Sequence, residues 1–428
     1  MGQTIQFCSG RTRRPGQDLA PRGVRGYRCL VTAMAAVLTL LCIAAASASA
    51  ASYAGTVLYP CTVPSGFSSG GPSNFAQTAA SGQVVGSGAV SGTVFGHAIL
   101  WSGPAGSPID LNPTNLSGIT ESIAYGTNGT QQVGNGWDSS YNERALLWSS
   151  TADSAVDLSP TNLSGFIDTY AMGTNGTQQV GSGLGNFSGT STGHALLWSG
   201  TAASAVDLHP TNLTWFFQST AVAISGTQQV GNGSNGLCSP GSSTVTHALL
   251  WSGTANSAVD LQPTNLTGFF DSYAYGVGGG QQVGSGDLDP QGGVAHALLW
   301  SGTADSAVDL NPTNLTGFTE SGANGTNGSQ QVGYGGGMGG PWHALLWSGT
   351  ADSAVDLHLL LPAAGTWTDS YAYSIDAAGN VYGTADGTFN DVTGTFAVEW
   401  SAVPEPTAVS MLVIGGVGLL ARRRRNDV

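Results

Sequence analysis

Residues 271–310 read DSYAYGVGGGQQVGSGDLDPQGGVAHALLWSGTADSAVDL and hold four short segments of strand length separated by polar turns. We name these segments, in chain order, strands A (272–275), B (281–284), C (296–300) and D (307–310). None of them shows the 3.6-residue apolar period of an amphipathic helix. Other copies of the unit place an Asn-Gly pair between strands A and B, as at Asn128-Gly129, which favours a hairpin because both turn residues accept positive φ. The stretch therefore predicts a four-stranded antiparallel unit.

The unit recurs along the chain, and a tryptophan closes strand C in each of seven copies. These residues are Trp101, Trp148, Trp198, Trp251, Trp300, Trp347 and Trp400. Their spacings are 47, 50, 53, 49, 47 and 53 residues. A period near 50 residues made of short strands is typical of the blades of a β-propeller, with a linear β-repeat array as the alternative.

The two ends of the repeat region favour a closed ring. After Trp400 the chain reaches Pro404 without supplying a seventh strand D, whereas residues 56–59 (TVLY) align with strand D of the second copy. The first strand would then complete the last blade, which removes a sheet edge open to aggregation. We predict an all-β, seven-bladed propeller closed by its N-terminal strand; a linear array would instead place residues 56–59 far from 396–400.

The repeat resembles a known family of extracellular repeats. Residues 79–86 (AASGQVVG), followed by 97–101 (HAILW) and the later HALLW copies, are similar to the HAF family. The resemblance covers nearly all of residues 54–400, with Arg144 and Phe396 as departures at the histidine position. It implies an exported protein and adds almost nothing about mechanism.

The N-terminal 50 residues have the order of a secretory signal. Six arginines at positions 11–28 precede an apolar run at about 30–46, which ends in small residues. A basic region, an apolar region and a small-residue exit predict a signal peptide, 1–50, cleaved after Ala50.

The C-terminal segment, 404–428, has three parts in order. Pro-Glu-Pro is followed by an apolar stretch at 407–421, shorter than the roughly 20 residues that span a bilayer, and by four arginines. The motif residues are Pro404, Glu405, Pro406, Arg422, Arg423, Arg424 and Arg425. The segment resembles the PEP-CTERM sorting signal of bacteria. The resemblance implies export to the cell surface or matrix, transient membrane contact and exosortase as a partner; an ordinary membrane anchor is the alternative.

Charge divides the chain sharply. Only 36 of its 428 residues are charged and it has no lysine. Ten of the eleven basic residues lie in the two terminal segments, so the predicted propeller domain, 51–403, has 22 acids, one base (Arg144) and a formal charge of −21. This composition argues against nucleic-acid binding, which needs clustered Lys and Arg. It predicts repulsion from anionic surfaces unless cations mediate the contact.

A histidine opens strand C in five copies and an aspartate stands in strand D in six. The histidines are His97, His194, His247, His296 and His343, and the aspartates are Asp110, Asp157, Asp207, Asp260, Asp309 and Asp356. Repeated Ser-His-Asp triads are implausible because catalysis needs one asymmetric site. We predict one structural hydrogen bond per blade between strands C and D.

A second set of acids precedes strand A. Glu121, Asp168, Asp271, Glu320 and Asp369 occupy equivalent positions. In a propeller these carboxylates would ring one mouth of the central channel, where they would bind a cation such as Ca²⁺. The alternative is that they are solvated residues suited to the start of a strand.

No copy carries a convincing catalytic pair, so the sequence favours a non-enzymatic surface or matrix protein that binds polysaccharide or a surface protein. An extracellular lyase or glycosidase is the alternative, and it would need one blade with its own acid and base. The fourth and seventh blades are the least regular. Trp215, Trp342 and Trp367 lie near loops where aromatic rings suit sugar stacking, with packing against the protein itself as the alternative.

Overall fold

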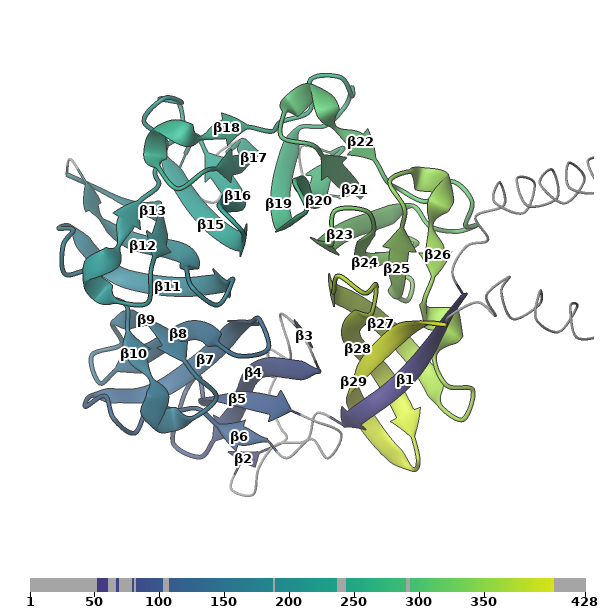
Figure 1. Ribbon diagram of the computed structural model, residues 1–428, viewed down its shortest axis with the longest axis horizontal. Helices are drawn as coiled ribbons and strands as arrows, with labels where there is room; N and C mark the ends of the chain where they lie inside the picture. The colour runs from purple at the N-terminus through teal and green to yellow at the C-terminus, as the bar shows by residue number, and fades with distance from the viewer. Residues whose placement is uncertain are drawn as a thin grey trace, which may run out of the picture. The chain divides into compact units, whose positions relative to one another are not determined.

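The computed structural model describes residues 52–60, 67–68, 79–80, 82–102, 108–187, 189–236, 244–289 and 293–403. These residues form a seven-bladed β-propeller, as predicted (Figure 1). The signal segment 1–50 and the sorting segment 404–428 lie outside the described residues. Within the described ranges, no helix is long and apolar enough to cross a membrane.

Each blade is an antiparallel sheet whose strands follow the order A, B, C, D. Strand A is β3 (Ala79–Ala80), β7 (Ile119–Thr127), β11 (Phe166–Thr174), β15 (Gln218–Ser225), β19 (Asp271–Gly278), β23 (Glu320–Thr326) and β27 (Thr366–Ile375) in blades 1 to 7. Strand B is β4 (Gln83–Val90), β8 (Gln132–Asp138), β12 (Gln179–Phe187), β16 (Gln228–Ser234), β20 (Gln281–Asp287), β24 (Gln331–Gly336) and β28 (Val381–Phe389).

The outer strands complete each blade. Strand C is β5 (His97–Ser102), β9 (Glu143–Trp148), β13 (Thr190–Trp198), β17 (Thr246–Trp251), β21 (Ala295–Trp300), β25 (His343–Trp347) and β29 (Val392–Val403). Strand D is β6 (Ile109–Asp110), β10 (Val156–Asp157), β14 (Val206–Asp207), β18 (Val259–Asp260), β22 (Val308–Asp309) and β26 (Val355–Asp356). A short extra strand, β2 (Phe67–Ser68), pairs with β4 in blade 1.

Single turns of 3-10 helix join strands C and D in blades 2 to 6. They are η1 (Ala152–Ser154), η2 (Ala202–Ser204), η3 (Ala255–Ser257), η4 (Ala304–Ser306) and η5 (Ala351–Ser353). A sixth, η6 (His358–Leu360), follows strand D of blade 6. The serine hydroxyl that ends each of η1–η5 donates to the carbonyl of the threonine before the helix, at 2.6 Å.

The N-terminal strand closes the ring, as predicted. β1 (Ser52–Pro60) pairs antiparallel with β29 and serves as strand D of blade 7, with Thr56 opposite Glu399 and Val57 opposite Val398. The two strands run side by side in Figure 1, although they come from opposite ends of the described chain. Closure of this kind leaves no long unpaired edge between the first and last blades.

The core lies between neighbouring blades. All seven strand-C tryptophans are fully buried. Trp198 of blade 3, for example, packs with Val133, Ala145 and Leu147 of blade 2. Because burying a large side chain is worth about 2–3 kcal/mol, the repeated tryptophan is a main contributor to cohesion between blades.

A glycine near the start of strand B lets strands A and B approach closely. A Cβ added at Gly181 would lie 1.8 Å from the carbonyl oxygen of Tyr170 and 2.9 Å from the Cα of Ala171. The same crowding recurs at the equivalent glycines of other blades, among them Gly231 and Gly284. The glycine of the repeat therefore has a steric role in pairing the two inner strands.

Candidate functional site

The two faces of the ring differ in the loops that they carry. We call the face where strand B passes into strand C the loop face, and the opposite face, where strand A turns into strand B, the turn face. The connections from strand D to the next strand A also lie on the loop face. The described chain ends, Ser52 and Val403, are paired with each other at the turn-face end of blade 7.

The predicted hydrogen bond between strands C and D is confirmed in five blades. The histidine Nδ1 atoms lie 2.8–2.9 Å from a carboxylate oxygen of the strand-D aspartate. In blade 2 Arg144 replaces the histidine, and its Nη1 donates to Asp157 Oδ2 at 3.2 Å. The other oxygen of the aspartate accepts a backbone N–H two residues later, as Asp207 Oδ1 does from His209. These pairs hold the outer strands together.

The structure does not gather the five carboxylates before strand A into a cation site. Four of them accept backbone N–H bonds from the blade before: Glu121 from Val94 (3.0 Å) and Phe95 (2.5 Å), Asp168 from Glu143 (2.9 Å), Asp271 from Thr246 (2.6 Å) and Asp369 from Trp342 (2.9 Å). Glu320 occupies the equivalent place at the start of β23. Among the described residues, no group of three or more His, Cys, Asp or Glu side chains is placed to hold a metal ion. The four carboxylates that accept these bonds instead join successive blades.

The acids of the propeller lie mainly on the loop face. By strand position and register, seventeen of the 22 carboxylates of residues 51–403 are at this face. They are Asp110, Glu121, Asp138, Glu143, Asp157, Asp168, Asp207, Asp260, Asp271, Asp287, Asp289, Asp309, Glu320, Asp356, Asp369, Asp386 and Asp391. The turn face has the other five, Asp153, Asp305, Asp352, Asp376 and Glu399. Since Arg144 is the one base, the loop face is strongly negative.

Exposed apolar side chains accompany these acids at the tips of the loops. Val94, Tyr141 and Met338, in the B–C connections of blades 1, 2 and 6, are 70%, 61% and 74% exposed. Ile167 and Trp215, near the starts of strands A in blades 3 and 4, are also exposed. A surface that is both acidic and apolar is suited to a partner that carries basic and apolar groups.

One cluster, which extends from the loop face along the strands of blades 2 and 3, combines acid and aromatic groups. We name it the acid–aromatic cluster; its members are Tyr125, Trp137, Glu143, Asp168 and Tyr170, from blades 2 and 3. The indole Nε1 of Trp137 donates to Glu143 Oε1 at 2.8 Å, and the Tyr170 hydroxyl also bonds to the Glu143 carboxylate. The backbone N–H of Glu143 donates to Asp168. Tyr125 lies close enough for the negative charge of Glu143 to raise its pKa.

Burial perturbs the acidity of this cluster. Loss of water around the carboxylate, with a smaller effect of the nearby Asp168 charge, raises the pKa of Glu143. Burial and the Glu143 charge raise the pKa of Tyr125 to about 12. Sequence reasoning missed this cluster and pointed to blades 4 and 7. The available signal was the Glu143-Arg144 pair, where five of the other blades have a neutral residue followed by histidine.

A second group of acids and tyrosines spans blades 5 to 7. The Tyr334 ring packs edge-on against Trp342 and Tyr371, with centroids 5.3 and 5.6 Å apart. Burial and the neighbouring Asp271 and Asp289 charges raise the pKa of Asp287. Within the described residues this group has no counterpart of Glu143, an acid held by two side-chain donors.

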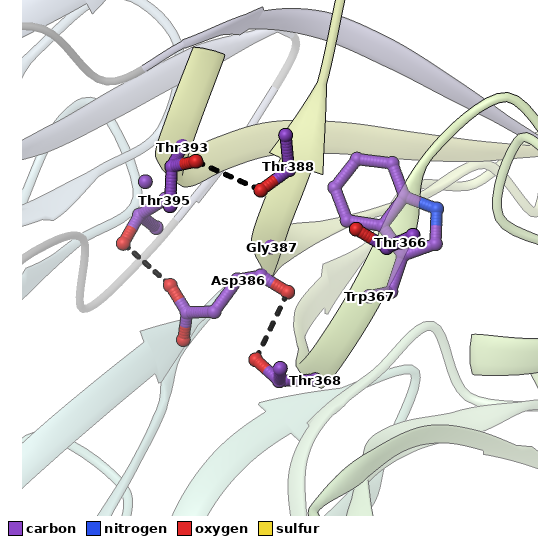
Figure 2. Close-up of a pocket in the computed structure, with 9 residues that line it drawn as sticks. Thr366, Trp367, Thr368, Asp386, Gly387, Thr388, Thr393 and Thr395 are labelled. Carbon is purple, nitrogen blue, oxygen red and sulfur yellow. Dashed lines mark hydrogen bonds between the residues drawn. The ribbon is translucent and has the colours of Figure 1, made fainter. Parts of the chain in front are cut away.

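Blade 7 contains a hollow of about 380 Å³ lined by threonines, Trp367, Asp386 and two glycines. Figure 2 shows the hydrogen bonds among its lining residues, one of which runs from the Thr368 hydroxyl to the backbone carbonyl of Asp386. The hydroxyls of Thr388 and Thr393 lie 2.8 Å apart, and the Thr395 hydroxyl donates to Asp386 Oδ1 at 2.5 Å. Of the five threonines that line the hollow, two bond to each other and two, Thr368 and Thr395, donate to Asp386. Among the described residues that line it, the hollow has one carboxylate, that of Asp386, and no second acid or base.

No protein-family model and no curated protein matches this chain, so the HAF and PEP-CTERM resemblances stay predictions. Solved propellers are similar in fold. The β-propeller domain of the trilobed protease from Pyrococcus furiosus is 8% identical with a TM-score of 0.47, over 78% of this chain and 99% of that chain. Puromycin hydrolase is 12% identical with a TM-score of 0.47, over 78% of this chain and 52% of that chain. A prolyl endopeptidase is 14% identical with a TM-score of 0.45, and the match covers 73% of this chain and 45% of that chain.

The comparisons do not bear out the expectation of a non-enzymatic surface or matrix protein, or of a glycan-active enzyme: the similar propellers belong to proteases and peptidases. At such low identity the likeness shows the fold alone and assigns no peptidase activity to this chain. The chain also spans only about half the length of puromycin hydrolase.

Proposed function

We propose that the propeller recognises a positively charged segment of a partner protein through its loop face. The observation that carries the proposal is the charge asymmetry, with seventeen carboxylates and one arginine on the loop face against five carboxylates on the turn face. The domain has no lysine, so a partner must supply the positive charge. Complementary charge attracts the partner towards the loop face and orients it on that surface.

The apolar loop tips support a peptide rather than a small ion as the ligand. Val94, Tyr141 and Met338 project from three different blades, and such side chains provide contact area that charge alone does not. The B–C connections that carry them also differ from blade to blade in length and sequence. Variable loops on a regular scaffold are where recognition is usually located.

The test is titration calorimetry of hexalysine against the propeller at 50 and 200 mM NaCl. Binding is expected at low salt and is expected to weaken about tenfold at the higher salt because exposed charges are screened. Hexaglutamate is the charge-reversed control. Absence of hexalysine binding at 50 mM NaCl would overturn the proposal.

Two matched triple variants locate the surface. Asp287→Asn, Asp289→Asn and Asp391→Asn together remove three loop-face charges, and Asp153→Asn, Asp305→Asn and Asp352→Asn remove three from the turn face. The first variant is expected to weaken binding severalfold and the second to leave it nearly unchanged. Mass spectrometry of the peptide after incubation distinguishes recognition from cleavage; released fragments would assign the domain a peptidase role instead.

We also propose that the chain is exported, with removal of residues 1–50 and exosortase processing near Pro404-Glu405-Pro406. Support comes from the order of basic, apolar and small residues at the N-terminus and of Pro-Glu-Pro, apolar and Arg segments at the C-terminus. Mass spectrometry of the protein secreted by an exosortase-bearing host is the test. A mature chain that still begins before residue 51 and retains Arg422–Arg425 would contradict it.

A further inference from the structure

The acid–aromatic cluster stands where blade 2 departs from the repeat. The residue before the strand-C histidine is Gly96, Gly193, Thr246, Ala295 or Trp342 in other blades, and Glu143 in blade 2. Trp137, which donates to Glu143, also has no tryptophan counterpart at its position in strand B of the other blades. The cluster is therefore not a by-product of the scaffold that all seven blades share.

The Glu143 carboxylate is held in place by two donors and can accept further hydrogen bonds. The indole of Trp137 and the hydroxyl of Tyr170 supply two donors to its carboxylate. A carboxylate has about four acceptor positions. These neutral donors orient the group without cancelling its charge, and Asp168 adds a second negative charge nearby. A partly buried carboxylate beside another acid is stabilised by a cation that replaces its lost hydration.

A second, independent observation comes from Asn135. This residue is fully buried, and neither its Nδ2 nor its Oδ1 has a hydrogen-bond partner among the described residues. Asn135 and Trp137 are two residues apart on β8, so their side chains leave the same face of the strand. The equivalent Asn232 of blade 4 accepts from the backbone N–H of Ala274 at 3.0 Å, so the repeat can satisfy this amide. In blade 2 the amide beside the cluster is left without a partner, and buried amides are rarely left so.

We propose that the acid–aromatic cluster binds a single organic cation, the ammonium or guanidinium group of a side chain, with Glu143 as its charge partner and Asn135 as an additional hydrogen-bond partner. The aromatic rings of Tyr125 and Tyr170 add cation–π attraction. A guanidinium, with five donors in a fixed fork, can reach more than one acceptor, whereas an ammonium acts as a point charge. This inference rests on the proposed function and names the residues that anchor its ligand.

The test compares Glu143→Gln with Glu399→Gln, which makes the same change on the turn face. Calorimetry with hexalysine and hexaarginine is expected to show at least tenfold weaker binding for Glu143→Gln and a change within twofold for Glu399→Gln. The stronger-bound of the two peptides identifies the preferred cation. If the wild-type protein binds hexalysine and Glu143→Gln binds it equally well, this inference is wrong and the proposed function stands. If the wild-type protein binds neither peptide, the proposed function itself fails.

Two further measurements keep the test independent of folding defects. Tyr170→Phe removes a hydroxyl that holds Glu143, and Tyr273→Phe is the control at the same position in blade 5; only the first is expected to weaken binding. Affinity for the peptides should also rise with pH as Glu143 loses its proton, and this rise should be smaller in Glu143→Gln. Identical pH profiles for the two proteins would overturn the assignment of Glu143.

Discussion

His209 provides a prediction whose size follows from its surroundings. Its Nδ1 lies 2.9 Å from the Ser219 hydroxyl, and that oxygen also accepts the backbone N–H of Ala195. The ring stacks on His194 with centroids 4.1 Å apart. Burial, with a smaller effect of His194, lowers the pKa of His209 to about 4. The neutral imidazole is therefore the form that fits the folded blade.

The effect on stability has a defined sign. Because the folded pKa is depressed, the unfolded chain takes up the proton first, and stability falls as the pH drops from about 6.5 towards 4. At pH 4.5 a full shift would cost about 2.5 kcal/mol, and solvent screening of the partly exposed ring reduces this to about 1–2 kcal/mol. For a domain of this size that corresponds to a fall of about 1–3 °C in the melting temperature.

His209→Asn should remove this acid sensitivity. Blades 1 and 5 already use asparagine there: Asn112 and Asn311 each accept the serine hydroxyl at 2.8 Å. Melting temperatures of both proteins are measured at pH 7.5 and 4.5, and the variant is expected to lose about 1–3 °C less than the wild type. Equal losses would show that His209 does not titrate with a depressed pKa and would refute the reasoning.

Three other predictions concern the same scaffold. His358 stacks on His343, and burial is the main cause that lowers the pKa of His358 as well. His358→Asn should therefore also reduce the loss of melting temperature between pH 7.5 and 4.5. A larger loss in the variant than in the wild type would contradict this prediction. Gly181→Ala should lower the free energy of unfolding, measured by urea titration, by at least about 2 kcal/mol. Gly193→Ala is the control and should be nearly neutral, because its added Cβ would meet nothing nearer than 4.0 Å. Equal effects of the two substitutions would contradict the steric role of Gly181. Thr56→Cys with Glu399→Cys should form a disulfide under mild oxidation, because these residues are directly paired, and failure to cross-link in the folded protein would argue against closure by β1.

The blade number and the ring closure could be predicted from sequence because each depends on a repeated local pattern. A tryptophan at a period near 50 fixes one blade per copy, and the missing last strand D required residues 56–59 to supply it. The contacts between strands C and D were predictable for the same reason, since His and Asp recur 13 residues apart in register.

The functional surface was less predictable because it depends on contacts between blades. Glu121 and Asp168 were expected to converge on the channel, but backbone N–H groups of the preceding blade take up their oxygens. Strand alternation does not reveal such donors. Glu143 was overlooked because Trp137 and Tyr170 reach it from a neighbouring strand and a neighbouring blade, respectively.

The central claim, that the loop face recognises basic peptides, is tested most directly by hydrogen exchange with and without hexalysine. Protection is expected in the B–C connections around residues 92–96, 138–143 and 337–342 and at the starts of strands A, with no change in the A–B turns at 128–131 and 327–330. Protection confined to the A–B turns, or none at a peptide concentration that saturates binding, would contradict the account.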